Sequence, residues 1–274
     1  MYRVVTRMDR PAVRMDVLAT IAVLALGLAS PSLGSAEPGP DVTILVYHRF
    51  GPAVVDGMTV RTTTFEANLR SLAESGRPVI PLRRLVDYRL GRAPAPPAGA
   101  VVITADDGHR SVYTEMLPVV RKFHVPVTLF VYPSAISNAD YALTWAQLRE
   151  LRDSGLIEVQ SHTYWHPNFR VEKRRLPADE YERFVRSQLE RSRTILAREL
   201  GTPIDLLAWP FGIYDRELMD AAARAGYIAA VTIDGRPATD ADDLLALPRH
   251  LMVDGYRGAA FTRLLAPLER PVGR

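Results

Sequence analysis

Residues 100–108, AVVITADDG, decide the fold class of this chain. Ala100–Thr104 is a short run without a charged side chain, which predicts a buried β-strand. Asp106, Asp107 and Gly108 follow that run almost at once. In folds built on parallel strands, functional groups gather on the loops that leave the carboxyl ends of the strands. The stretch therefore predicts a strand of an α/β sheet with chemistry at its carboxyl end.

Outward from this stretch, short apolar strands alternate with amphipathic helices, which is typical of α/β domains with parallel strands. The sequence contains no repeat and no internal linker, so we expect one domain over residues 41–274. Seven strands with intervening helices either close as an incomplete barrel or open as a doubly wound sheet, and the periodicity does not choose between the two. The other six strands are expected at Val42–Tyr47, Val127–Tyr132, Ile157–Gln160, Leu206–Trp209, Ile228–Ile233 and Leu247–Val253. Helices are expected around Phe65–Leu72, Val112–Phe123, Trp145–Arg152, Ala178–Leu200 and Arg216–Ala225.

Two polar groups at strand ends suggest a metal centre. Asp106 and Asp107 are adjacent carboxylates, which are costly after a buried strand unless a cation binds there. They also fit a plain capping turn, because Asp-Gly is common in turns. After another strand, His162 and His166 stand four residues apart, and two imidazoles with a carboxylate make a divalent site with open positions for water. Together the two groups favour a metal, and Pro167 favours a loop rather than a regular helix at His166.

Two further segments lie at the same predicted edge of the sheet. Residues 47–50 (YHRF) end the first strand, and His48 in this segment is either catalytic or structural. Residues 209–212 (WPFG) follow a later strand and otherwise read as a tight turn. The aromatic residues near this edge, which either stack on a ligand or belong to the core, are Phe50, Tyr164, Trp165, Phe169, Trp209 and Tyr214.

These segments, in this order, resemble the motifs of the polysaccharide deacetylases of carbohydrate esterase family 4, which have the NodB-homology fold. Residues 104–108 (TADDG) resemble the family's TFDDG motif, residues 161–166 (SHTYWH) its H-[ST]-x-x-H motif, and residues 210–212 (PFG) its P-[YF]-G motif. The leading YHRF segment is most similar to the exported poly-β-1,6-N-acetylglucosamine deacetylases, in which the catalytic histidine comes first. The resemblance covers nearly all of residues 41–274. It implies a single-domain α/β fold, a distorted and incomplete (β/α)7-type barrel.

The resemblance also implies a role for each site residue. Asp106 would be the general base that takes a proton from water, and His48 the general acid that protonates the departing amine. The backbone N–H of Phe211 would contribute to an oxyanion hole. One divalent ion is implied; zinc is preferred, and iron, cobalt, nickel and manganese also suit these ligands. The implied metal ligands are Asp107, His162 and His166.

This sequence departs from the family pattern at two positions. The usual motif has an arginine that pairs with the base where this chain has Ala208, and Arg249 is the candidate to supply that charge from another strand. Ala105 replaces the phenylalanine of the TFDDG motif, which removes bulk beside the carboxylates. His250 also lies near a strand and competes with His48 as the general acid, and the resemblance favours His48.

The composition excludes several classes of function. The 274 residues include no cysteine, which excludes disulfides, thiolate metal sites and a cysteine nucleophile. Residues 1–36 combine an arginine-containing leader, a 13-residue apolar run and small residues, which is typical of a secretory signal peptide. The alternatives are an uncleaved anchor and a start codon placed too early, although 13 residues fall short of the roughly 20 that cross a bilayer. Without this segment 30 basic and 29 acidic residues remain, so we expect no nucleic-acid partner.

We therefore expect an exported, periplasmic or extracellular enzyme with no stable membrane insertion after signal cleavage. The expected reaction is metal-dependent removal of acetyl groups from an N-acetylglucosamine polysaccharide, with the β-1,6-linked polymer preferred. Peptidoglycan or chitooligosaccharides are alternative substrates, and a catalytically silent saccharide-binding module on the same fold is the alternative from another class. A glycosidase is disfavoured, because its two carboxylates stand about 5 to 9.5 Å apart across a sugar rather than adjacent in the chain. The sequence names no protein partner.

Overall fold

Seven parallel strands form a curled half-barrel in the computed structural model, which describes residues 39–266. The strand order is β8-β7-β6-β5-β4-β1-β9, so neighbouring strands follow the chain order except where β1 lies between β4 and β9. The fold is the incomplete barrel, not the open doubly wound sheet. The expected signal peptide over residues 1–36 lies outside the described residues. The strands of the sheet are β1 (Thr43–Tyr47), β4 (Val101–Ala105), β5 (Val127–Val131), β6 (Ile157–Ser161), β7 (Leu206–Ala208), β8 (Ala229–Val231) and β9 (His250–Leu251).

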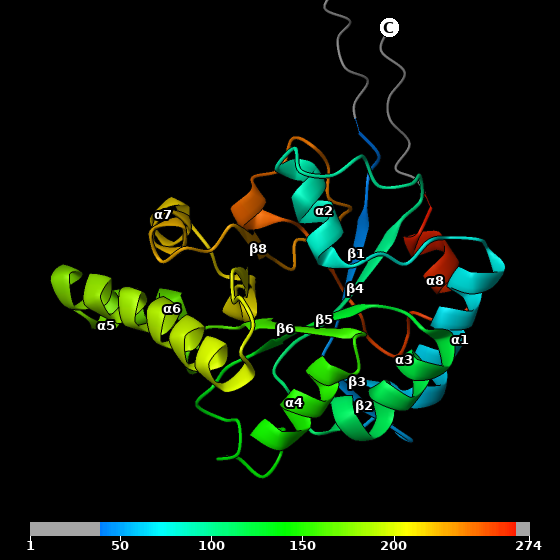
Figure 1. Cartoon of the computed structure of the whole chain (residues 1–274), viewed down its shortest axis with the longest axis horizontal. Helices are drawn as coiled ribbons and strands as arrows, with labels where there is room; N and C mark the ends of the chain where they lie inside the picture. Colours follow the sequence, from blue (N-terminus) through cyan, green and yellow to red (C-terminus); the bar gives the residue numbers. More distant parts are fainter. Residues whose placement is uncertain (1–38, 267–274) are drawn as a thin grey trace, which may run out of the picture. The chain divides into compact units, whose positions relative to one another are not determined.

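Helices surround the sheet, and in the view of Figure 1 α1, α3 and α8 lie to its right and α5, α6 and α7 to its left. The longest, α6, buries an apolar face and ends at Gly201 in the left-handed conformation, as its sequence pattern predicts. Helix α4 begins with a capping box between Thr144 and Gln147. The helices are α1 (Thr62–Glu74), α2 (Leu82–Arg89), α3 (Leu117–Phe123), α4 (Trp145–Asp153), α5 (Phe169–Arg175), α6 (Ala178–Leu200), α7 (Arg216–Arg224) and α8 (Ala259–Leu264).

Some elements were not expected from the sequence pattern. A separate pair of short parallel strands, β2 (Arg49–Gly51) and β3 (Thr59–Arg61), follows β1. Helices α2, α5 and α8 are six to eight residues long, too short for the apolar period to repeat clearly. The seventh expected strand is also shorter, because only two of its residues pair with β1.

Residues 247–252 nearly close the barrel, because their backbone forms hydrogen bonds both to β8 and to β1. On one side, Leu247 N–H donates to Ala230 O at 2.9 Å, within strand β8. On the other side, Met252 N–H donates to Val46 O at 2.9 Å, within β1. The residues between these two points therefore cross the seam of the barrel, and Arg249 is one of them.

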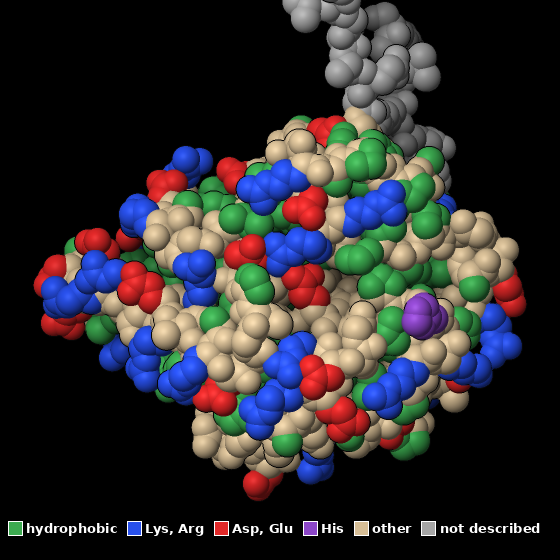
Figure 2. Space-filling view, in the orientation of Figure 1, with side chains coloured by type: hydrophobic (Ala, Val, Ile, Leu, Met, Phe, Trp, Pro, Cys, Tyr) green, Lys and Arg blue, Asp and Glu red, His purple; other side chains and the backbone are tan. Residues whose placement is uncertain are grey.

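Side chains inside the barrel form a second apolar cluster, separate from the main core under the outer helices. It includes Ile44 of β1, Val102 of β4, Phe130 of β5 and Val231 of β8. Leu85 and other apolar residues of α2 belong to the same cluster, so α2 covers one end of the barrel. Figure 2 shows charges of both signs intermixed on one face of the molecule. Within the described part of the chain, none of the helices combines the length and the apolar character that crossing a bilayer requires.

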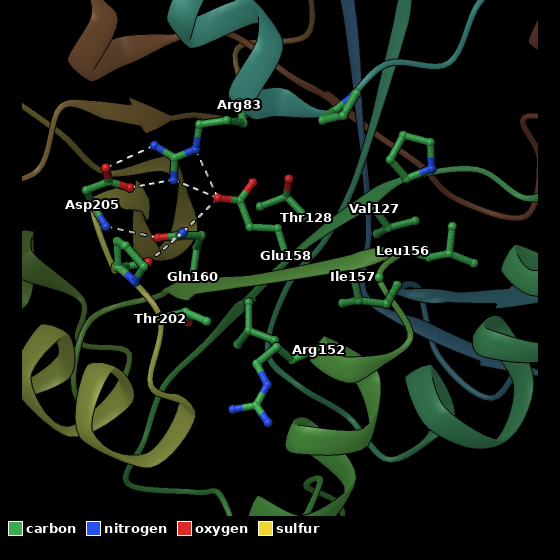
Figure 3. A pocket seen from close by; sticks show the side chains of 15 residues that line it. Arg83, Val127, Thr128, Arg152, Leu156, Ile157, Glu158, Gln160, Thr202 and Asp205 are labelled. Carbon is green, nitrogen blue, oxygen red and sulfur yellow. Dashed lines mark hydrogen bonds and ion pairs between the residues drawn. The ribbon is translucent and has the colours of Figure 1, made fainter.

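An ion cluster fastens α2 to the amino ends of the strands (Figure 3). Arg83 of α2 lies 2.6 Å from Glu158 of β6 and 2.5 Å from Asp205, just before β7. Gln160 completes the cluster, since its side chain donates to Glu158 at 3.0 Å and accepts from the backbone N–H of Asp205 at 3.0 Å. The polar groups of this cluster therefore satisfy one another, which is typical of a structural contact.

We expect Arg83→Met to lower the free energy of unfolding by about 2 kcal/mol, because it removes charge-assisted hydrogen bonds to two partly buried carboxylates. Urea unfolding followed by circular dichroism measures the change. Arg84→Met, at the neighbouring position on α2, is the control with an expected change below about 0.5 kcal/mol. Equal stability of the two variants would contradict the structural role of Arg83.

Candidate active site

A cavity of about 420 Å³ opens at the carboxyl ends of the strands. Loops after β1, β4, β6, β7 and β8 all contribute to it, as expected for a site at the carboxyl ends of parallel strands. Six of the site residues expected from the sequence line this cavity, and Arg249 lies behind it. The lining residues are His48, Arg49, Met58, Asp106, Asp107, Tyr132, His162, His166, Trp209, Phe211, Gly212, Ile233 and Leu251.

Three of these residues form a group that suits a divalent metal ion. The Nε2 atoms of His162 and His166 each lie 3.7 Å from Asp107 Oδ1. The ligand atoms of all three residues lie within 4.8 Å of one another. Tetrahedral ligands at about 2.1 Å from an ion stand about 3.4 Å apart, so small side-chain adjustments would accommodate one.

The second ring nitrogen of His162 is already occupied. Its Nδ1 lies 2.8 Å from the carbonyl oxygen of Ala208, so Nδ1 carries the proton and donates it. This hydrogen bond leaves Nε2 with its lone pair available for an ion. Ala208 stands where the family motif has an arginine. Its backbone carbonyl oxygen orients the ring of His162 through this hydrogen bond.

The loops that carry the site hold unusual backbone conformations. Positive φ angles occur at Asp107 (72°), Thr163 (65°), His166 (63°) and Phe211 (56°). Such angles are costly for residues other than glycine and cluster at functional sites. Gly108 is also left-handed, with a φ of 71°, and an added Cβ would lie 2.9 Å from Val131. The DDG turn therefore requires glycine at its third position.

Asp106 pairs with a fully buried arginine. Arg249 donates to Asp106 Oδ1 at 2.9 Å and to Oδ2 at 2.7 Å, and Asp106 itself is only 2% exposed. Arg249 is further fixed by hydrogen bonds to Thr232 O at 2.8 Å and to Thr104 Oγ1 at 2.9 Å. Burial raises the pKa of Asp106, but the charge of Arg249 and its hydrogen bonds outweigh burial and lower this pKa. Asp106 is therefore an ionised carboxylate at neutral pH.

We expect Arg249→Met to shift the acid limb of the pH profile of kcat/KM to higher pH. With the guanidinium removed, burial dominates and raises the pKa of Asp106. Asp106 then becomes ionised, and so able to act as the base, only at a higher pH. Stopped assays between pH 4 and 9 measure the limb, and Arg249→Lys, which keeps a positive charge, should show the smaller shift. An unmoved limb in both variants would show that Arg249 does not set the ionisation of Asp106.

His48 lines the cavity and His250 does not. The Nδ1 atom of His48 is buried and has no hydrogen-bond partner among the described residues. Burial lowers the pKa of His48, while the charges of Asp106 and Asp107 act to raise it. His250 lies on β9 opposite Leu45, outside the residues that line the cavity. Of the two candidate acids, His48 is the one beside the carboxylates.

Of the aromatic residues singled out from the sequence, only Trp209 lines the cavity. Phe50, Phe169 and Trp209 are almost fully buried and belong to the core, whereas Trp165 is 41% exposed and lies outside the cavity lining. Tyr132, which the sequence analysis did not single out, packs against His166 with ring centroids 5.4 Å apart. Tyr132 directly follows β5. The rule that functional groups gather at the carboxyl ends of parallel strands could therefore have identified it. Met58, Ile233 and Leu251 also line the cavity, and no sequence pattern marked them.

Residues 93–230 match the model of the polysaccharide deacetylase family. This chain belongs to the polysaccharide deacetylase family. Members of the family are amide hydrolases, so the chain is an enzyme of that class. The matched residues include the carboxylate pair, His162, His166 and the turn at Phe211, all of which line the cavity.

Named relatives agree with this family. YxkH of Bacillus subtilis, named as a polysaccharide deacetylase, is 26% identical over 82% of this chain and 76% of its own length. The poly-β-1,6-N-acetyl-D-glucosamine N-deacetylase of Escherichia coli is 25% identical over 72% of this chain. The matched region is only 34% of that enzyme's length, so the chain spans about one third of it. The Staphylococcus epidermidis enzyme of the same name is 22% identical over 74% of this chain and 71% of its own length.

Solved structures share the fold. The deacetylase PplD of Streptococcus pyogenes superposes with a TM-score of 0.74 at 21% identity, over 84% of this chain and 100% of that chain. IcaB of Ammonifex degensii gives 0.72 at 24% identity, over 83% and 98%. These two superpositions show that both proteins share the fold of this chain.

Proposed function

We propose that this protein is a metal-dependent N-deacetylase that removes acetyl groups from N-acetylglucosamine units of an exported polysaccharide. The observation that carries the proposal is that one cavity holds Asp106, His48 and the group of Asp107, His162 and His166, while the buried Arg249 pairs with Asp106 from behind. The names of the Escherichia coli and Staphylococcus relatives favour the β-1,6-linked polymer as substrate.

A divalent ion held by Asp107, His162 and His166 would polarise the acetyl carbonyl and acidify water, with zinc preferred by these ligands. Asp106 takes the proton of the attacking water as its oxygen bonds to the carbonyl carbon. Arg249 keeps Asp106 ionised and fixed in orientation. Asp106 and Asp107 thus have different tasks, one as base and the other as ligand.

The departing amine needs a proton, because an amide nitrogen is otherwise a poor leaving group. His48 supplies that proton as the carbon–nitrogen bond breaks, which releases acetate and a free amine. The backbone N–H of Phe211, on the turn that borders the cavity, donates to the oxyanion as it forms. One such donor contributes about 3 kcal/mol to related acyl transfers.

We expect His48→Ala to reduce kcat by about 10² to 10⁴ while the metal content stays unchanged, because the acid acts after the ion is bound. Amine release and metal analysis of the same sample separate these two effects. His250→Ala is the matched control, since His250 lies outside the cavity, and it should keep full turnover. Full turnover of His48→Ala would refute the assignment of the acid.

The catalytically silent saccharide-binding module is the second candidate. Such a module would need no complete set of base, acid and ligands, whereas all of those groups line one cavity in this chain. Peptidoglycan and chitooligosaccharides remain the alternative substrates for an active enzyme.

We assign residues 1–36 as a cleaved export signal and residues 41–274 as the deacetylase domain, which works in the periplasm or outside the cell.

The deciding experiment measures free-amine release from poly-β-1,6-N-acetylglucosamine and from chitooligosaccharides with zinc, with cobalt, and with a chelator. Release that the chelator abolishes would support the metal-dependent deacetylase, and the faster substrate would identify the linkage. Bound metal without release from either polymer would favour peptidoglycan as substrate. Absence of metal binding would favour the silent module.

A further inference from the structure

Residues 161–166, which we call the histidine loop, leave β6 and carry both histidines of the ligand group. The backbone of this loop is strained, with positive φ angles at Thr163 (65°) and His166 (63°). Residues other than glycine keep such angles only where the surrounding structure fixes them. The hydrogen bonds that fix the histidine loop therefore decide where its two imidazole rings stand.

The start of the histidine loop is anchored by buried hydroxyl groups. Ser161 Oγ lies 2.7 Å from Ser192 Oγ of α6, and both serines are fully buried. The hydroxyl of Tyr227, just before β8, bonds to Ser161 Oγ at 2.8 Å. Ser161 Oγ also accepts the backbone N–H of Thr163 at 3.2 Å, so the anchor reaches the first strained residue.

The end of the histidine loop is held by Gln188 of α6. Trp165 N–H donates to Gln188 Oε1 at 3.1 Å. His166 N–H turns back into the loop and donates to Thr163 Oγ1 at 3.2 Å, and Pro167 has no N–H. The bond to Gln188 is thus the one backbone donation from residues 165–167 that reaches another element. It lies directly before a ligand histidine.

Gln188 occupies a position where a glutamine is costly. It is 3% exposed and shares the buried face of α6 with Val185 and Leu189. A buried amide lowers stability unless it is hydrogen-bonded, and an apolar side chain would suit this face. One turn earlier on α6, Phe184 packs against the ring of Trp165 with centroids 5.9 Å apart. A polar residue that breaks the pattern of its own helix is expected to serve a site.

We propose that Gln188 is a positioning residue for the metal centre. Its amide oxygen holds Trp165 N–H and so keeps His166 in the left-handed conformation, with Nε2 3.7 Å from Asp107 Oδ1. This inference rests on the proposed function, because it assumes that Asp107, His162 and His166 bind a metal ion. Ligands that are already in place lose less conformational entropy when the ion enters. Loss of the bond to Gln188 therefore weakens metal binding.

The first test measures zinc affinity by isothermal titration. Gln188→Met removes the acceptor and nearly keeps the shape of the side chain. We expect its affinity to fall about tenfold, the lower end of the 10- to 100-fold range for residues that support metal ligands. Gln188→Glu keeps an acceptor oxygen and should retain most of the affinity. Unchanged affinity in Gln188→Met would overturn the proposal.

Leu196→Ala is the control for a general loss of stability. Leu196 is a fully buried residue of the same helix and makes none of the bonds to the histidine loop. Its truncation should lower the midpoint of thermal unfolding at least as much as Gln188→Met does, because it leaves a cavity in the core. Zinc affinity should nevertheless stay unchanged. An equal fall of affinity in Leu196→Ala would overturn the specific role of Gln188.

The second test reads the geometry of the site and the order of the loop. The visible absorption spectrum of the cobalt-loaded protein reports how the ligands surround the ion. This spectrum should change in Gln188→Met and match that of the unmodified protein in Gln188→Glu and Leu196→Ala. In the metal-free protein, the Trp165 amide should exchange with deuterium about tenfold faster in Gln188→Met than in Leu196→Ala.

The two tests separate this inference from the proposed function. If the unmodified protein binds neither zinc nor cobalt, the proposed metal-dependent function fails. If it binds both, and Gln188→Met has the same spectrum and the same amide exchange as the unmodified protein, only the positioning role of Gln188 fails.

Discussion

Asp106→Asn should reduce kcat by about 10³ to 10⁴ and leave the fold and the metal content nearly unchanged. The amide matches the shape of the carboxylate but cannot accept a proton from water, so the step that creates the nucleophile loses its base. Effects of general-base removal reach about 10⁴. Amine release from the polymer at neutral pH, with metal analysis of the same sample, measures both quantities.

The variant has one structural cost that needs a control. The neutral amide of Asp106→Asn would leave the buried charge of Arg249 without its partner, and breaking a buried pair costs about 3 to 5 kcal/mol. Thermal unfolding with and without zinc therefore accompanies the assay, and activity is measured well below the midpoint. Residual activity above about a tenth in a folded, metal-loaded sample would exclude Asp106 as the base.

His162→Ala should abolish activity by a different route, through loss of the metal. The substitution removes one of three ligand atoms and leaves the Ala208 carbonyl without its donor. We expect metal affinity to fall at least about a hundredfold, since loss of an outer partner alone costs 10- to 100-fold. Isothermal titration with zinc measures the affinity directly, without any substrate.

His124→Asn is the matched control for that measurement. His124 ends α3 in the left-handed conformation, which asparagine also adopts, and it lies outside the ligand group. Its zinc affinity should equal that of the unmodified protein. If His162→Ala bound zinc as tightly as this control, the metal would have to lie elsewhere.

The positions of the main strands along the chain were predictable because each is an apolar run too short for a helix. All seven expected strands are present, and the strand at 100–104 starts and ends within one residue of its prediction. The choice between barrel and open sheet was not accessible from periodicity, since both use the same strands. Closure depends on backbone bonds such as Leu247 to Ala230 and Met252 to Val46, which carry no sequence signal.

The site was predictable where its residues follow a strand directly. His48, Asp107 and His162 each come at a carboxyl end, and parallel strands bring such ends together. The contact between Arg249 and Asp106 was only a hypothesis, because 143 residues separate them and strand order decides their distance.

The seam segment 247–252 links the ionisation of Asp106 to the integrity of the barrel. Local opening at the seam would withdraw Arg249 and leave the buried carboxylate with a raised pKa, even if every other element stayed folded. The enzyme would then lose its base before it lost its shape, so heat or denaturant should inactivate it ahead of global unfolding. Amide protons of Leu247 and Met252 are the reporters, because their exchange with deuterium should rise in step with the loss of turnover.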